Sequence, residues 1–214
     1  MLFVAVCRSC AVCRYFPLPA VCGYFEMLGT PATAGVSLFH TLGEAVRDRL
    51  MTVDTIHDLF EHGLEDIYHA EHELLDALSE LESNTEREEI AEAFAEHRAE
   101  TEEQIDRLEE VFEMFGEPPE KEECEGIKGL IEEYEEFASM DPSQEVMDFH
   151  SMAAAEKTEH YEIAAYGNLI PLADQLGMDD AADLLEENLR EEQAALDELK
   201  ELTESYEMDA IPAE

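Results

Sequence analysis

Acidic side chains interrupt the apolar stripes of several predicted helices in this 214-residue chain. Glu71 is the clearest case, because Leu64, Ile67, Leu74 and Leu78 surround it at helical spacing. A buried carboxylate needs a compensating charge, since desolvating it alone costs several kcal/mol. The chain has 12 Lys and Arg residues against 55 Asp and Glu residues, so shared protons or metal ions are the available partners.

Other predicted helices carry comparable polar residues. Glu100, Glu159 and Glu191 each stand near the middle of a further stripe. His97 lies three residues before Glu100, so its imidazole is a candidate ligand. Glu162 lies three residues after Glu159 and is a second candidate carboxylate on that helix. Four glutamates would balance the charge of two divalent cations, and iron or manganese favours carboxylates combined with one or two imidazoles.

A metal-free interpretation fits the same residues. Protonated or hydrogen-bonded glutamates, together with His97, would form a polar layer that fixes the register of the helices and binds nothing. His160 and Glu156 lie beside the stripes and are weaker candidates for ligands. The periodicity alone leaves metal binding and a metal-free layer both open.

The elements that must position these residues are helices. From Asp54 onward the apolar residues recur with a helical period, and strand-like alternation is absent. Gly116 and Pro118 end the second helix. The predicted helices cover residues 54–82, 85–115, 123–139, 143–175 and 179–206. Four long helices, two short turns and one long crossover predict an all-α, ferritin-like four-helix bundle with a short extra helix in the crossover.

The two predicted helical hairpins resemble each other. Glu71 aligns with Glu159, and His97 aligns with Asn188, with large hydrophobic residues matching at the positions that follow. This internal repeat predicts a pseudo-twofold bundle in which both hairpins contribute to one polar layer at mid-height.

The charge of the chain is strongly negative. The formal net charge is −43, although 45% of the residues are hydrophobic, which is ordinary for a globular protein. Acidic residues spread along every helix are typical of proteins adapted to concentrated salt, where screening makes self-repulsion tolerable. Such a surface disfavours binding to nucleic acid or to an anionic membrane. We therefore predict a halophilic, cytoplasmic protein.

The first fifty residues differ from the rest. They contain three acidic and four basic residues, and four of the five cysteines: Cys7, Cys10, Cys13 and Cys22. The cysteine spacing lacks the paired layout of strong zinc motifs. Arginines interrupt any signal-peptide core, and no 18-residue stretch is free of charge. We expect two parts: a non-native or disordered extension over 1–50, and a bundle over 51–214 that begins at the natural start, Met51.

Several stretches resemble the YciE/YciF ferritin-like family. The run 159–169 resembles its helix-3 signature, and the segments 95–101, 129–133 and 184–189 are also similar to it, so the resemblance spans about 54–203. It implies the ferritin-like fold, a role in stress responses, and a ferroxidase-type activity. It also implies a dinuclear iron or manganese site whose ligands would be Glu71, His97, Glu100, Glu159, Glu162 and Glu191.

The chain departs from the usual di-iron pattern in two places. Ferritin-like di-iron enzymes commonly carry Glu-x-x-His on two helices, whereas here one helix reads His97-x-x-Glu100 and the other has Asn188 in place of histidine. We expect a metal-binding oxidoreductase that oxidises Fe(II) or removes peroxide, working as a homodimer. The alternative is a non-catalytic helical stress protein with a metal-free polar core.

Overall fold

The computed structural model describes residues 53–213. Within this range it contains five α-helices, one short 3-10 helix and no strand. The helices are α2 (Ile56–Asn84), α3 (Glu88–Phe115), α4 (Glu125–Ala138), α5 (Gln144–Leu176) and α6 (Asp179–Ser205), followed by η1 (Met208–Ala210). The predicted extension over 1–50, its four cysteines and the proposed start at Met51 lie outside the described residues.

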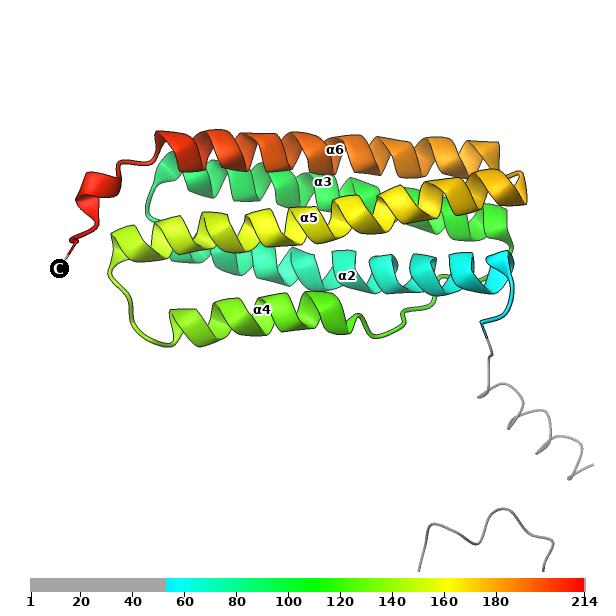
Figure 1. Cartoon of the computed structure of the whole chain (residues 1–214), viewed down its shortest axis with the longest axis horizontal. Coiled ribbons are helices and arrows are strands. Elements are labelled where there is room, and N and C mark those ends of the chain that lie inside the picture. Colours follow the sequence, from blue (N-terminus) through cyan, green and yellow to red (C-terminus); the bar gives the residue numbers. More distant parts are fainter. Residues whose placement is uncertain (1–52, 214) are drawn as a thin grey trace, which may run out of the picture. The chain divides into compact units, whose positions relative to one another are not determined.

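The four long helices form a bundle. Helices α2, α3, α5 and α6 run alongside one another, while the shorter α4 lies in the crossover against α5 and α2 (Figure 1). Short turns join α2 to α3 and α5 to α6, and the long crossover joins α3 to α5. The predicted all-α, ferritin-like bundle with an extra crossover helix is confirmed.

Local signals at the helix ends agree with this arrangement. Thr55 caps α2, because its side chain accepts a hydrogen bond from the backbone N–H of Asp58 while the Asp58 carboxylate accepts from Thr55 N–H. Gly116 ends α3 at φ 92° and Gly177 ends α5 at φ 74°. This left-handed backbone is favourable for glycine, so both helices stop where the next connection begins.

The core of the bundle consists of two hydrophobic clusters. The first includes Phe60, Leu64, Leu108, Phe112 and Leu185. The second includes Leu78, Ile90, Phe94, Met152 and Leu199. Along α3, α5 and α6 the two clusters are separated by a buried polar segment, which therefore lies at mid-height of the bundle.

None of the helices in the part of the chain that the structure describes combines the length and apolar character needed to cross a membrane.

Candidate metal centre

Five ionisable side chains from four helices form a buried polar layer between the two hydrophobic clusters. Glu71 comes from α2, His97 from α3, Glu159 and Glu162 from α5, and Glu192 from α6. The four glutamates are 0% exposed, and His97 is 7% exposed. The long helices therefore all contribute at least one ionisable group to a site that is almost fully buried.

Four of the five members of the polar layer are close enough to share a ligand. Selected atoms of His97, Glu159, Glu162 and Glu192 all lie within 4.8 Å of one another. The Nε2 atom of His97 is 3.2 Å from Oε1 of Glu159 and 3.6 Å from Oε2 of Glu192. Glu71 lies outside this group of four, but its charge contributes to the raised pKa values of Glu162 and Glu192.

Most carboxylate oxygens of the polar layer have no hydrogen-bond partner. Both oxygens of Glu159, Glu162 and Glu192 are buried and unpartnered. The same is true of Oε2 of Glu71. Buried polar atoms are nearly always satisfied in proteins, since an orphaned one costs about 1–3 kcal/mol and a charged one more. So many orphaned oxygens at one place indicate that a ligand or protons complete the layer.

The remaining oxygen of Glu71 is held by a hydrogen-bond chain. The Tyr166 hydroxyl donates to Oε1 of Glu71, and Nδ2 of Asn188 lies 3.0 Å from the Tyr166 oxygen, to which it donates. Arg107 in turn donates from Nε to Oδ1 of Asn188 at 2.5 Å. This chain of hydrogen bonds fixes Oε1 of Glu71 and leaves Oε2 buried without a hydrogen-bond partner.

Burial favours the neutral form of Glu71, Glu162 and Glu192. It raises the pKa of Glu71 to about 7, against the opposing effect of the hydrogen bond from Tyr166. It raises the pKa of Glu162 well above the ordinary value, and the charges of Glu192 and Glu71 add to the effect. The pKa of Glu192 is also raised well above its ordinary value, first by burial and then by the charge of Glu71.

For His97, in contrast to the acids, the surroundings favour the charged form of the side chain. Burial alone lowers the pKa of its imidazole, but the charge of Glu159 and the contributions of Glu100 and Glu192 outweigh burial. The net pKa of His97 is therefore well above its ordinary value. In the absence of another cation, the imidazolium is the positive charge that the polar layer holds.

Two of the predicted ligands lie outside the polar layer. The Glu100 side chain is 50% exposed, and its Oε2 is 3.5 Å from Nδ1 of His97 on the side away from Glu159. Glu191 is 25% exposed and forms an ion pair with Arg107, while Gln104 donates to it at 3.1 Å. The structure thus brings four of the six predicted ligands into the polar layer, namely Glu71, His97, Glu159 and Glu162, and leaves Glu100 and Glu191 outside it.

The carboxylate that α6 contributes is Glu192, which the sequence reasoning missed. The buried positions of α6 run Leu185, Asn188, Glu192, Leu196 and Leu199. Glu100 and Glu191 are predicted near the middle of their apolar stripes, yet both residues lie one position away from the buried face of their helices. The signal for Glu192 was its spacing of four residues from both Asn188 and Leu196.

The weaker candidates from the sequence also lie apart from the polar layer. His160 is exposed on α5, next to the buried Glu159. Glu156 accepts a hydrogen bond from the Thr203 hydroxyl at 2.8 Å and so has a partner on α6.

The donor set of the polar layer fits a metal ion. Oxygen atoms of glutamate are hard donors, and a single imidazole is common beside them in sites for iron and manganese. The unpartnered oxygens converge, and the cluster could hold a metal ion without displacing any existing hydrogen bond of those oxygens. Glu100 faces the second nitrogen of His97, the arrangement that orients a histidine ligand in many metal sites.

Comparisons with known proteins agree with the fold and with the family that the sequence resembles. The family described as "Domain of unknown function (DUF892)" matches residues 55–210. Protein YciF of Escherichia coli K12 is 45% identical over 145 residues, which cover 67% of this chain and 87% of YciF.

This chain matches two solved structures over nearly the whole length of those structures. The E. coli stress protein YciF has a TM-score of 0.69 at 42% identity, covering 72% of this chain and 97% of its own. YcfI from Rhodopseudomonas palustris has a TM-score of 0.69 at 39% identity, covering 71% and 96% respectively.

Proposed function

Because this chain belongs to the family described as DUF892, a domain of unknown function, we propose its function from the geometry of the polar layer. The proposed function is to bind a dinuclear centre of iron or manganese in the middle of the bundle. The ligands would be the five members of the polar layer: Glu71, His97, Glu159, Glu162 and Glu192. Glu100 and Glu191 stand at the rim of this set and are not needed to complete it.

One observation carries the proposal, namely the orphaned oxygens of Glu159, Glu162 and Glu192. Buried carboxylates without donors are very costly when charged, and cations remove that cost. Lysine and arginine do not reach these oxygens in the described part of the chain, because no ion pair joins either residue type to the three glutamates.

The bound metals would supply redox chemistry, either the oxidation of Fe(II) or the removal of peroxide. The residues of the chain would prepare the site for that chemistry. Tyr166 and Asn188 hold the Glu71 carboxylate in one orientation, and Glu100 faces the imidazole of His97. The two hydrophobic clusters exclude bulk water from both ends of the polar layer. Since the E. coli relative is described as a stress protein, this activity would serve a stress response.

A second candidate is a metal-free layer with a structural role. It is favoured by the raised pKa values of Glu71, Glu162 and Glu192, because neutral carboxylic acids can remain buried without a cation. In that case the layer specifies how the two hairpins pack, and no reaction is catalysed.

Metal counting with a matched pair of variants separates the two functions. The full chain is purified in high salt, loaded anaerobically with Fe(II) or Mn(II), and desalted before its metal content is measured. We expect about two ions per chain. Glu192→Gln should lower the affinity by about tenfold or more, because it removes one buried negative charge from the ligand set. Glu191→Gln, at the neighbouring position, should leave the metal content unchanged.

Two results would contradict the metal centre. One is a chain that retains no metal at any loading concentration. The other is an equal effect of the Glu192 and Glu191 substitutions on the metal content. That result would show that metal retention depends on the negative charge of the surface and not on the polar layer.

A further inference from the structure

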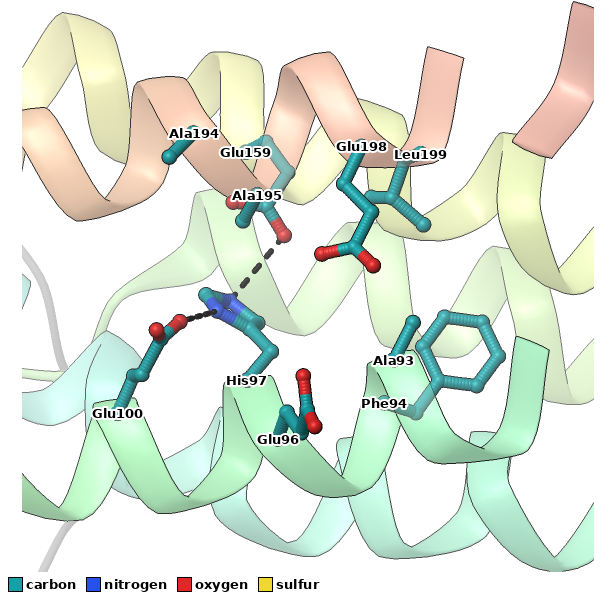
Figure 2. Close-up of a pocket in the computed structure, with 10 residues that line it drawn as sticks. All are labelled: Ala93, Phe94, Glu96, His97, Glu100, Glu159, Ala194, Ala195, Glu198 and Leu199. Atoms are coloured by element: carbon teal, nitrogen blue, oxygen red, sulfur yellow. Dashed lines mark ion pairs between the residues drawn. The ribbon is translucent and has the colours of Figure 1, made fainter. Parts of the chain in front are cut away.

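A small pocket opens between α3 and α6 at the height of the polar layer. Its volume is about 80 Å³, and its walls include Ala93, Ala194 and Ala195. The small side chains of these alanines leave space between the two helices, and Phe94 and Leu199 form the apolar part of the wall. The close-up in Figure 2 shows the pocket between the two helices.

Two members of the polar layer line the inner end of this pocket. They are His97, whose buried Nδ1 atom makes no hydrogen bond, and Glu159, whose two buried oxygens make no hydrogen bond either. The His97 ring lies between Glu100 and Glu159, and Figure 2 shows these three side chains in a row. The pocket therefore connects directly with the atoms that the proposed centre would use.

The outer end of the pocket is acidic. Glu96, Glu100 and Glu198 line it, and all three are exposed. Negative charges around a narrow opening raise the local concentration of cations and increase their association rate by about 10–1000-fold at low salt. Carboxylates can also replace water molecules around a metal ion one at a time as it moves inward.

The volume limits what can enter. A water molecule occupies about 30 Å³ in the liquid, so the pocket has room for only a few molecules of that size. A metal ion with part of its hydration shell fits into this space.

A second small pocket between helices does not lead to the polar layer. A pocket of about 30 Å³ among α2, α4 and α5 is lined mostly by apolar residues, including Leu74, Leu78 and Ala154. None of the five members of the polar layer lines it. An ion in that pocket would meet no carboxylate of the layer.

We propose that the pocket between α3 and α6 is the passage by which hydrated divalent cations reach the polar layer. Glu96, Glu100 and Glu198 collect the cation, and His97 and Glu159 receive it from them. This inference rests on the proposed metal centre, and the test therefore measures the rate of loading separately from the final metal content.

The test uses Co(II), whose visible absorption changes when carboxylates and imidazole replace water. Rapid mixing of the full chain with Co(II) gives the rate constant of loading, and equilibrium titration gives the stoichiometry. Ala195→Leu fills the pocket from α6. It should slow loading by about tenfold or more, since the ion must then wait for local opening of the bundle. The final stoichiometry should remain that of the unchanged chain.

Ala154→Leu is the matched control, because Ala154 is a half-buried alanine in the apolar pocket on the other side of the bundle. It should load at the rate of the unchanged chain.

A second variant tests the acidic opening without altering the packing. Glu96→Gln combined with Glu198→Gln should slow loading by about tenfold at the lowest salt concentration at which circular dichroism shows the bundle folded, and the difference should shrink in molar salt because of screening. The control combines Glu132→Gln with Glu136→Gln, two exposed glutamates on α4 that do not line the pocket. It removes the same charge and should change the rate little.

The outcomes distinguish the passage from the centre. Slower loading in Ala195→Leu and in the Glu96/Glu198 variant, with normal controls and normal stoichiometry, supports the passage. Equal rates in all variants, with metal bound at the usual stoichiometry, overturn the passage and leave the centre in place. A chain that binds no Co(II) overturns both.

Discussion

Three buried acids of the polar layer, Glu71, Glu162 and Glu192, link the stability of the metal-free protein to pH. Their pKa values in the folded chain are raised, to about 7 for Glu71, whereas in an unfolded chain a glutamate titrates near 4.5. Between these values the folded state binds more protons than the unfolded state. The free energy of unfolding therefore falls as the pH rises through this window.

We predict that the metal-free protein in molar salt is more stable at pH 5 than at pH 7.5. Glu71 alone would contribute on the order of 3 kcal/mol to the pH dependence of the free energy of unfolding, since each pKa unit corresponds to about 1.4 kcal/mol. Thermal melting at the two pH values, with a chelator present, measures the difference. Molar salt keeps the repulsion between surface carboxylates small.

Glu71→Gln is the control for this effect, because glutamine keeps the size and can still accept the hydrogen bond from Tyr166. The difference in melting temperature between the two pH values should become smaller in this variant. A metal-free protein whose melting temperature rises from pH 5 to pH 7.5 would contradict the prediction.

The sequence predicts much of the polar layer, because a charged residue in an apolar stripe is visible without a structure. Glu71 and Glu159 are surrounded by hydrophobic residues at helical spacing, and the structure buries both. Glu192 could not be separated from Glu191 in this way. Successive residues of a helix point about 100° apart, and Ala195 beside Leu196 left the buried face of α6 ambiguous by one position.

At the scale of whole elements, a small group of hydrogen bonds and packing contacts at the first turn of helix α4 holds this helix against the bundle. The Cys124 backbone N–H donates to Nδ1 of His69 on α2 at 3.2 Å. The Tyr161 hydroxyl on α5 donates to Oδ2 of Asp66 at 2.6 Å and lies 2.9 Å from the Cys124 sulfur. Gly126 leaves the space for this tyrosine, since a Cβ atom there would lie 2.7 Å from Cε2 of Tyr161.

Two glycine substitutions in α4 should therefore have opposite effects. Gly126→Ala should destabilise the protein by about 1–3 kcal/mol, because the ring of Tyr161 must move from a hydrogen-bonded position. Gly129→Ala has no neighbour within 4 Å of its Cβ and should stabilise by about 0.5–1 kcal/mol through helix propensity. Chemical denaturation measures both values. Equal effects of the two substitutions would show that the contact with Tyr161 does not hold α4 in place.

The helices themselves follow from the sequence to within a few residues. Gly116 and Gly177 mark two ends, and the apolar period marks the rest. The position of α4 on the bundle does not follow from the sequence. Its amphipathic pattern indicates that one face is buried, but it does not indicate which helices that face contacts. Only the structure places Gly126 against Tyr161, two residues on separate helices.

At the scale of the whole molecule, the dominant property is a net charge of −43 on 214 residues. Many of the acidic side chains lie exposed along all five helices. The Debye length is about 3 Å at 1 M salt and about 10 Å at 0.1 M, so neighbouring carboxylates repel one another far more strongly in dilute buffer. Few of them have a basic partner, since the chain contains 12 Lys and Arg residues.

We predict that lowering the salt from about 2 M to about 0.1 M lowers the melting temperature or unfolds the bundle. Circular dichroism at a series of sodium chloride concentrations measures the effect. A glycerol series at constant salt provides a control for general solvent effects. A melting temperature that stays the same across the salt series would contradict adaptation to high salt.

The division of the polar layer between the two hairpins has a consequence for the order of folding. The α2–α3 hairpin carries Glu71 and His97, and the α5–α6 hairpin carries Glu159, Glu162 and Glu192. Each hairpin can form from contacts close in sequence while its charged groups remain hydrated. The groups lose water together, when the hairpins come into contact across the long crossover. The electrostatic cost of the layer therefore falls on that late encounter, and a proton or a cation that neutralises the layer at that moment speeds the completion of the fold.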